Sequence, residues 1–128
     1  MTTTKNIGIW MDHAVAHLME LKNDEITTQN ITSDFTHQEK EHSLNKSENL
    51  MHNKEQHQQA KYYNTIKDAT KNHESILLFG PTTAKNELLN LMKADHHFEN
   101  IKVEAIQADK MTENQQHAFV KQHFYSQL

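Results

Sequence analysis

The chain contains no cysteine, no arginine, one proline and two glycines among its 128 residues. Without cysteine, neither a disulfide framework nor a zinc site built on thiolates is possible. No run of 18 apolar residues occurs, and the first six residues are mostly polar and lead directly into a predicted strand. We therefore expect no membrane span, no secretory signal and a location in the cytoplasm.

The absence of arginine bears on the kinds of partner the chain can have. All thirteen basic residues are lysines, and the formal net charge at pH 7 is -4. Arginine supplies bidentate contacts to phosphate and guanine and stacks on bases. A negatively charged chain without it is not the pattern of a dedicated, sequence-specific nucleic-acid reader.

The size of the chain fits one domain over residues 1–128 with one hydrophobic core. Only 35% of the residues are hydrophobic, and the mean hydropathy of -0.89 is low for a globular protein. This composition predicts a modest core together with a substantial solvated segment.

Three extended runs open the chain. Apolar residues alternate over 7–12, which predicts a strand, and the runs 14–21 and 25–31 predict two more. Only Asp12 and His13 separate the first two runs, and both residue types tolerate the positive φ of a two-residue turn. The sequence therefore predicts an antiparallel meander of three strands.

The segment 32–58 is polar and has very few apolar residues. We interpret it as a mobile loop that leads into a helix, with helical structure starting from about Glu48. Over 56–70 the apolar residues recur at helical spacing, which predicts a helix there. These apolar positions are Tyr62, Tyr63, Ile66 and Ala69.

The most informative segment is the buried strand predicted at 76–79 and the turn after it. Four apolar residues in a row, without alternation, indicate a strand that is covered on both faces. Pro81 ends the strand, and Thr82 or Thr83 can cap the following helix. Such a turn offers backbone N–H groups at the positive end of a helix dipole, which suits an anion. It lacks the second glycine of a Walker loop, and a purely structural turn is the other interpretation.

The rest of the chain continues this alternation of helix and strand. The helix predicted at 84–93 should face the core with Leu88, Leu91 and Met92. Residues 101–105 predict a fifth strand. Thr112 and Gln115 form a capping box that opens a last helix, which carries Phe119, Val120 and Phe124.

This element order predicts the architecture. Two right-handed crossovers make strands four and five parallel to strand one. The fold class is therefore α/β, with a ribonuclease-H-like mixed sheet of five strands in the order 3-2-1-4-5. Strand two is antiparallel to strand one, and helices cover both faces.

The predicted topology brings several polar residues to one edge of the sheet. The carboxyl ends of strands one, four and five meet there, at the edge where open α/β sheets tend to bind ligands. The candidate binding pocket consists of Asp12, His13, Gly80, Thr82, Thr83, Lys85, Asp109 and Lys110. Its two lysines favour an anion, whereas its two carboxylates oppose one unless a cation bridges them.

Three motifs in order resemble known proteins: Ile9-Trp10-Met11-Asp12-His13, the stretch Phe79-Gly80-Pro81-Thr82-Thr83-Ala84-Lys85, and Ala108-Asp109-Lys110-Met111-Thr112-Glu113. These motifs resemble the hallmarks of a family of small, functionally uncharacterised bacterial proteins. The chain also resembles, with the same fold, the middle domain of the eukaryotic and archaeal peptide-chain release factor and of its relative Pelota. The elements that match that domain are the β-meander with Ile7–Trp10, the long polar segment, Ile76–Pro81, Lys85 and Glu87.

The resemblance implies a translation-machinery-like fold without the catalysis of the release factor. That factor hydrolyses peptidyl-tRNA with a Gly-Gly-Gln motif in the loop that corresponds to 32–58, and this segment contains no glycine. Pelota also lacks the motif and acts on stalled ribosomes with its other domains. We therefore expect a non-catalytic binding module, with a ribosome or a protein as partner through residues 32–71.

The alternative that the fold suggests is a metal-dependent nuclease, or a phosphate- or nucleotide-binding enzyme. Nuclease chemistry needs clustered carboxylates, and only Asp12 and Asp109 reach the edge. The eleven histidines lack metal-ligand spacing: four residues along a strand place His13 and His17 roughly 13 Å apart, and His96 and His97 are adjacent. We predict no metal site, no cofactor and no catalytic residue that spacing can identify.

Overall fold

The computed structural model describes residues 5–22, 25–33 and 48–126, with the side chains of helix α2 described from Gln59 onward. The elements are β1 (Asn6–Met11), β2 (Val15–Lys22), β3 (Glu25–Thr32), α2 (Glu48–Thr70), β4 (Ser75–Gly80), α3 (Ala84–Lys93), the short 3-10 helix η1 (His96–Phe98), β5 (Lys102–Gln107) and α4 (Glu113–Tyr125). All of the predicted strands and helices are present.

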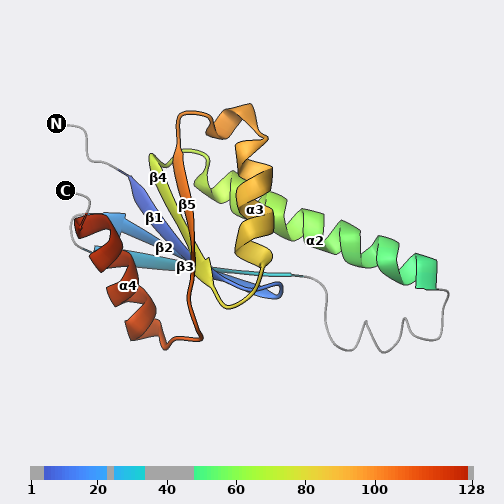
Figure 1. Ribbon diagram of the computed structural model, residues 1–128, viewed down its shortest axis with the longest axis horizontal. Helices are drawn as coiled ribbons and strands as arrows, with labels where there is room; N and C mark the ends of the chain where they lie inside the picture. The colour runs from blue at the N-terminus through green and yellow to red at the C-terminus, as the bar shows by residue number, and fades with distance from the viewer. Residues whose placement is uncertain (1–4, 23–24, 34–47, 127–128) are drawn as a thin grey trace.

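The five strands form one mixed sheet in the order β3-β2-β1-β4-β5 (Figure 1). β2 is antiparallel to β1 and β3, whereas β4 is parallel to β1 and β5 is parallel to β4. The predicted ribonuclease-H-like topology is confirmed. The apolar run 76–79 lies inside the sheet between β1 and β5, as a strand with no alternation should.

The sheet separates two apolar clusters, because successive side chains along a strand point to opposite faces. α2 and α3 cover one face, and α4 covers the other (Figure 1). The first cluster includes Ile7, Ile9, Met11, Tyr62, Tyr63, Ile66, Ile76, Leu78, Leu88 and Met92. The second includes Trp10, Met19, Leu21, Leu77, Phe79, Val120 and Phe124.

The turn between β1 and β2 lies one residue later than predicted. Met11 pairs with Ala16, and Asp12 N–H donates to the carbonyl of Val15, so His13 and Ala14 are the two central residues. The cause is the Asp12 carboxylate, whose Oδ1 accepts from the N–H groups of Ala14 at 2.7 Å and Val15 at 2.8 Å. An aspartate at the first position of a turn commonly fixes the turn in this way.

The buried face of α3 also differs from the prediction. Leu91, predicted to face the core, is 43% exposed. Lys85, which was not predicted to be buried, is 2% exposed. Lys85, Leu88 and Met92 follow one another at intervals of three and four residues, so they share one helix face. Thr83 holds the N-cap position, but its side chain makes no capping bond to the backbone of the helix, and the Thr82 hydroxyl accepts from Ala84 N–H at 3.2 Å. The capping box of Thr112 and Gln115 is confirmed.

The segment 32–58 is described in part. α2 begins at Glu48 and extends well beyond the edge of the sheet (Figure 1). The remainder of the predicted loop, 34–47, lies outside the described residues, so its mobility stays a prediction. No helix in the described part of the chain is long and apolar enough to cross a membrane.

Candidate functional site

Glu87 on α3 is the centre of the polar contacts at the carboxyl edge of the sheet. Its Oε1 accepts from the Tyr63 hydroxyl of α2 at 2.7 Å. Its Oε2 accepts from the Thr83 hydroxyl and from His13 Nε2, both at 3.3 Å. The carboxylate therefore joins three segments of the chain: the turn after β1, the first turn of α3 and helix α2.

The protonation states at this edge follow from the contacts. Burial raises the pKa of Glu87, but the hydrogen bonds from Tyr63, His13 and Thr83 outweigh it, so the pKa lies below its ordinary value. Glu87 is therefore a carboxylate at neutral pH. Burial above all raises the pKa values of the Tyr62 and Tyr63 hydroxyls, which keeps both hydroxyls available as donors.

Asp12 has a structural role in the turn that it begins. One of its carboxylate oxygens accepts from two N–H groups of that turn. Its backbone carbonyl accepts from the Tyr62 hydroxyl at 2.9 Å, which attaches the turn to α2. These bonds show that Asp12 fixes the shape and the position of the turn.

Lys85 holds the turn 80–83 from the inside of the protein. Its ammonium donates to the carbonyl of Thr82 at 2.5 Å and to Gln107 Oε1 at 2.7 Å, and Gln107 Nε2 donates to the carbonyl of Pro81 at 3.2 Å. Burial lowers the pKa of Lys85. No salt bridge to Lys85 occurs among the described residues, so both acceptors known for this cation are neutral.

Because Gly80 has no side chain, the last residue of β4 can lie directly beside the backbone of β1. Its φ of 153° lies in a region that favours glycine. A Cβ atom there would lie 2.1 Å from the Met11 carbonyl oxygen, so any side chain would collide with the backbone of β1. Gly80 C=O in turn accepts from Ala108 N–H at 3.1 Å, which fixes the end of β5 beside the turn.

The predicted pocket residues are thus brought to one edge in separate groups. Glu87 links His13 with Thr83, Lys85 binds the Thr82 carbonyl, and Asp12 is bound within its own turn. Asp109 and Lys110 are exposed, and in the described part of the chain no hydrogen bond or ion pair joins either to the others.

Sequence reasoning missed three of the residues that organise this edge. Glu87 lies four residues after Thr83, so helical spacing could have suggested their contact. Tyr63 was assigned only to the core, and nothing in its sequence position shows that its hydroxyl reaches Glu87. Gln107 gives no local signal either, because its partners are 22 and 26 residues away.

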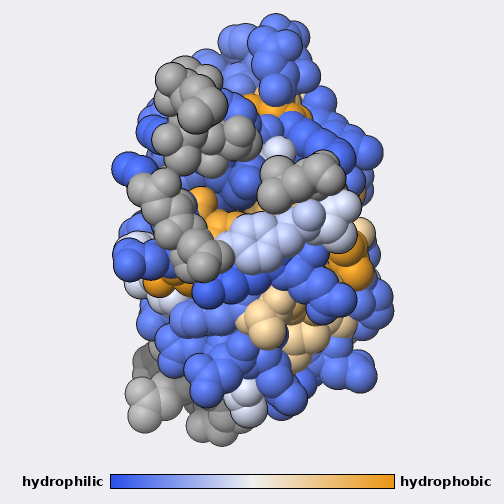
Figure 2. Space-filling model, turned by 90° about the vertical axis from the view of Figure 1, so that its left-hand side faces the viewer, coloured by the Kyte–Doolittle hydropathy of each residue, from blue (hydrophilic) through white to orange (hydrophobic). Residues whose placement is uncertain are grey.

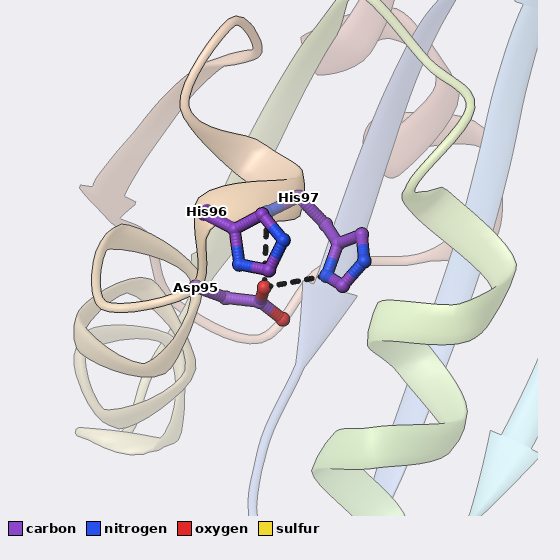
Figure 3. A group of neighbouring side chains, drawn as sticks. All are labelled: Asp95, His96 and His97. Atoms are coloured by element: carbon purple, nitrogen blue, oxygen red, sulfur yellow. Dashed lines mark hydrogen bonds and ion pairs between the residues drawn. The ribbon is translucent and has the colours of Figure 1, made fainter.

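A second group of polar side chains lies at the other end of α3. Asp95, His96 and His97 each present a potential metal-ligating atom, and these atoms lie within 4.8 Å of one another. Figure 3 shows both imidazole rings beside the Asp95 carboxylate. It is the one such group of three in the described part of the chain.

Comparison with known proteins extends the description of the fold. No protein-family model matches the chain, and no curated protein matches its sequence. Among solved structures, the chain is similar to Pelota from Archaeoglobus fulgidus, with a TM-score of 0.59 and 9% identity over 95% of this chain and 32% of that one. Pelota from Thermoplasma acidophilum gives a TM-score of 0.58 and 17% identity over 97% of this chain and 32% of that one.

The chain therefore spans about a third of the length of the Pelota proteins that it matches, as the shared 32% shows. Sequence identities of 9% and 17% are too low to carry more than the architecture. The predicted resemblance to Pelota is confirmed at the level of fold: this chain has the fold of one part of the archaeal Pelota proteins.

Proposed function

We propose that the chain is a non-catalytic, cytoplasmic binding module of the translational machinery, of the bacterial family that its motifs resemble. Its partner is a ribosome or a protein, bound through residues 32–71. The proposal rests on the Pelota-like fold and on one observation at the carboxyl edge of the sheet. There, three charged groups, Asp12, Lys85 and Glu87, are bonded within the protein.

The contacts of three charged side chains support this interpretation. Asp12 is bonded to its own turn, Lys85 to the turn 80–83, and Glu87 to three donors. These hydrogen bonds fix the position of each group and use part of its bonding capacity. Engaged groups of this kind favour a structural edge over a catalytic one.

Helix α2 supports the placement of the partner surface. It extends beyond the sheet (Figure 1). On its described part and just after it, the exposed side chains mix both charges: Lys61, Asn64, Thr65 and Asp68 on α2, and Lys71 in the turn that follows. The face on the α4 side is mainly hydrophilic and shows apolar residues only in small, separate patches (Figure 2).

Sedimentation with purified bacterial ribosomes tests the proposal. The protein should appear in the ribosomal fractions of a sucrose gradient. The double variant Lys61→Glu, Lys71→Glu, on α2 and the turn after it, should shift it to the free fraction. The matched control is Lys93→Glu with Lys102→Glu, two exposed lysines outside the proposed surface. Ribosome binding that both double variants weaken equally would show that α2 is not the docking element. Absence of binding, together with capture of no protein partner through α2, would overturn the proposal.

Assays for catalysis complete the test. The protein should release no peptide from peptidyl-tRNA, because 32–58 contains no glycine and hence no Gly-Gly-Gln motif. The alternative, a metal-dependent nuclease or a phosphate- or nucleotide-binding enzyme, predicts Mg²⁺-dependent cleavage of RNA or DNA that Asp12→Asn and Asp109→Asn both abolish. Such cleavage would replace the binding proposal.

The candidate pocket at the sheet edge has its own test. Phosphate or a nucleotide is titrated with and without Mg²⁺ while the backbone amide signals of 82–85 are followed by NMR. Movement of these signals would support an anion site formed by the turn. Unchanged signals at millimolar ligand in both conditions would show that the turn is structural.

A further inference from the structure

The loop between α3 and β5 holds its side chains in a fixed arrangement. Asp95 is the N-cap of η1, and its Oδ1 accepts from His97 N–H at 3.0 Å. Phe98, the last residue of η1, is buried in the core. Phe98 N–H donates to the Asp95 carbonyl, and Asp95 N–H donates to the Met92 carbonyl. The short helix is therefore anchored on both sides, and its polar side chains are not on a free loop.

We propose that Asp95, His96 and His97 bind a divalent transition-metal ion, for which we name Zn²⁺ as the test ion. The three ligating atoms lie within 4.8 Å of one another, and the two imidazole rings are 4.2 Å apart between centroids (Figure 3). Zinc–ligand bonds of about 2.0–2.2 Å require ligand atoms about 3.5 Å apart, so small side-chain rotations suffice.

The chemistry of the donors selects the kind of metal. Two imidazole nitrogens and one carboxylate oxygen suit Zn²⁺, Ni²⁺ or Cu²⁺ better than Mg²⁺ or Ca²⁺, which prefer oxygen ligands alone. Three protein ligands leave a fourth position open, which is the pattern of an exchangeable site and not of a closed structural one. Asp95 and His97 also line a cavity of about 340 Å³ on the side of α2, and its other polar lining residues are Asn64, Lys67, Asp68 and Lys71.

Two of the proposed ligands already face each other. Asp95 Oδ1 and His97 Nδ1 are 2.8 Å apart. A carboxylate oxygen and an imidazole nitrogen therefore meet at the place where the metal ion is proposed to bind.

Lys67 is the main opposing group. Its ammonium lies 3.0 Å from Asp95 Oδ2, and its charge disfavours a cation nearby. However, Lys67 contacts Asp95 Oδ2, and the proposed metal ligand is Oδ1. A hydrogen bond to the second oxygen of a carboxylate orients that carboxylate in metal sites. We therefore expect a site of micromolar affinity and not a tight one.

Zinc titration of the full chain, by calorimetry and by the ring signals of the histidines in NMR, tests the proposal. Four of the eleven histidines lie in 34–58, outside the described side chains, so variants and not stoichiometry must identify the site. His96→Gln with His97→Gln should weaken Zn²⁺ binding by at least about tenfold, as loss of two ligands requires. Asp95→Asn should also weaken it, and the amide oxygen can still accept from His97 N–H and keep the fold.

The matched control is His117→Gln. His117 Nε2 lies 3.8 Å from a Glu113 oxygen, so this histidine also has a carboxylate neighbour but belongs to no group of three. Its replacement should leave zinc affinity unchanged, and thermal unfolding should confirm that all variants are folded. The proposal is overturned if the wild-type chain binds no Zn²⁺ at submillimolar concentration. It is also overturned if folded His96→Gln, His97→Gln protein binds Zn²⁺ as tightly as the wild type.

Discussion

Gly8 on β1 lies directly against Val120 on α4: a Cβ atom at Gly8 would be 2.3 Å from Val120 Cγ2. Among the described glycines only Gly80 has a positive φ. Position 8 therefore needs a glycine because Val120 leaves no room for a side chain, and not because of its backbone conformation. Val120 is fully buried, and this contact sets how closely α4 approaches the sheet. The contact also explains why β1, whose other residues have large side chains, has a glycine at position 8.

We predict that Gly8→Ala destabilises the protein by about 1–3 kcal/mol, the usual cost of overpacking a core. Val120→Ala alone leaves a small cavity and is also destabilising. In the double variant the new methyl group occupies the space that Val120 loses, so the two costs should not add. Urea unfolding of the four proteins measures this double-mutant cycle. Strict additivity would show that α4 moves away from the sheet instead.

Gly80→Ala should be more damaging, and Val120→Ala should not relieve it. The obstacle at Gly80 is the Met11 carbonyl oxygen at 2.1 Å, which belongs to the backbone and cannot rotate away. A φ of 153° adds strain for any residue with a side chain, of about 1–3 kcal/mol. Thermal unfolding should rank the variants, with Gly80→Ala below Gly8→Ala. The reverse order would contradict the contact.

Lys85→Met tests the buried ammonium through the dependence of stability on pH. The folded-state pKa of Lys85 is lower than the ordinary 10.5, so as pH rises the folded protein loses this proton before the unfolded chain does. The free energy of unfolding of the wild type should therefore rise, relative to Lys85→Met, between the folded-state pKa and 10.5. At neutral pH the variant should be less stable by about 1 kcal/mol, because the acceptors on Thr82 and Gln107 lose their donor.

Denaturant unfolding from neutral pH toward pH 10.5 measures this difference. The matched control is Lys93→Met, an exposed lysine of the same helix, which should follow the wild type at every pH. The ionisation of Tyr62 and Tyr63 is common to all three proteins and cancels in the comparison. Parallel curves for the wild type and Lys85→Met would show that the ammonium is solvated.

Glu87→Gln should make the protein less sensitive to acid. The folded-state pKa of Glu87 is lower than its ordinary value of 4.5. The stability it contributes is therefore present above pH 4.5 and is lost as pH falls through the lower folded-state value. Stability should decline less steeply in Glu87→Gln than in the wild type below pH 4.5. Tyr63→Phe removes one of the three donors and should give a smaller change in the same direction.

Circular dichroism during acid titration, with Glu99→Gln as an exposed control, checks this prediction. The control should retain the full acid response of the wild type. An unchanged acid response in Glu87→Gln would mean that the contacts with Tyr63, His13 and Thr83 do not favour the charged form.

The architecture of the protein follows from local patterns in its sequence. The uninterrupted apolar run 76–79 marked the strand buried inside the sheet, and Thr112 with Gln115 marked the start of the last helix. Both are local patterns, because hydrophobic period and capping involve residues within a few positions of one another. The handedness of crossovers then left one strand order, which the structure confirms.

The contacts between side chains that are distant in the sequence could be identified only from the tertiary structure. The apolar pattern of α3 placed Leu91 in the core, whereas the observed rotation of the helix exposes Leu91 and buries Lys85 beneath the turn. Glu87 binds Tyr63, 24 residues away, and His13, 74 residues away. Such contacts depend on how each helix is rotated about its axis and how closely it approaches the sheet. Those quantities are set by the packing of the whole core, so no local stretch of sequence contains them.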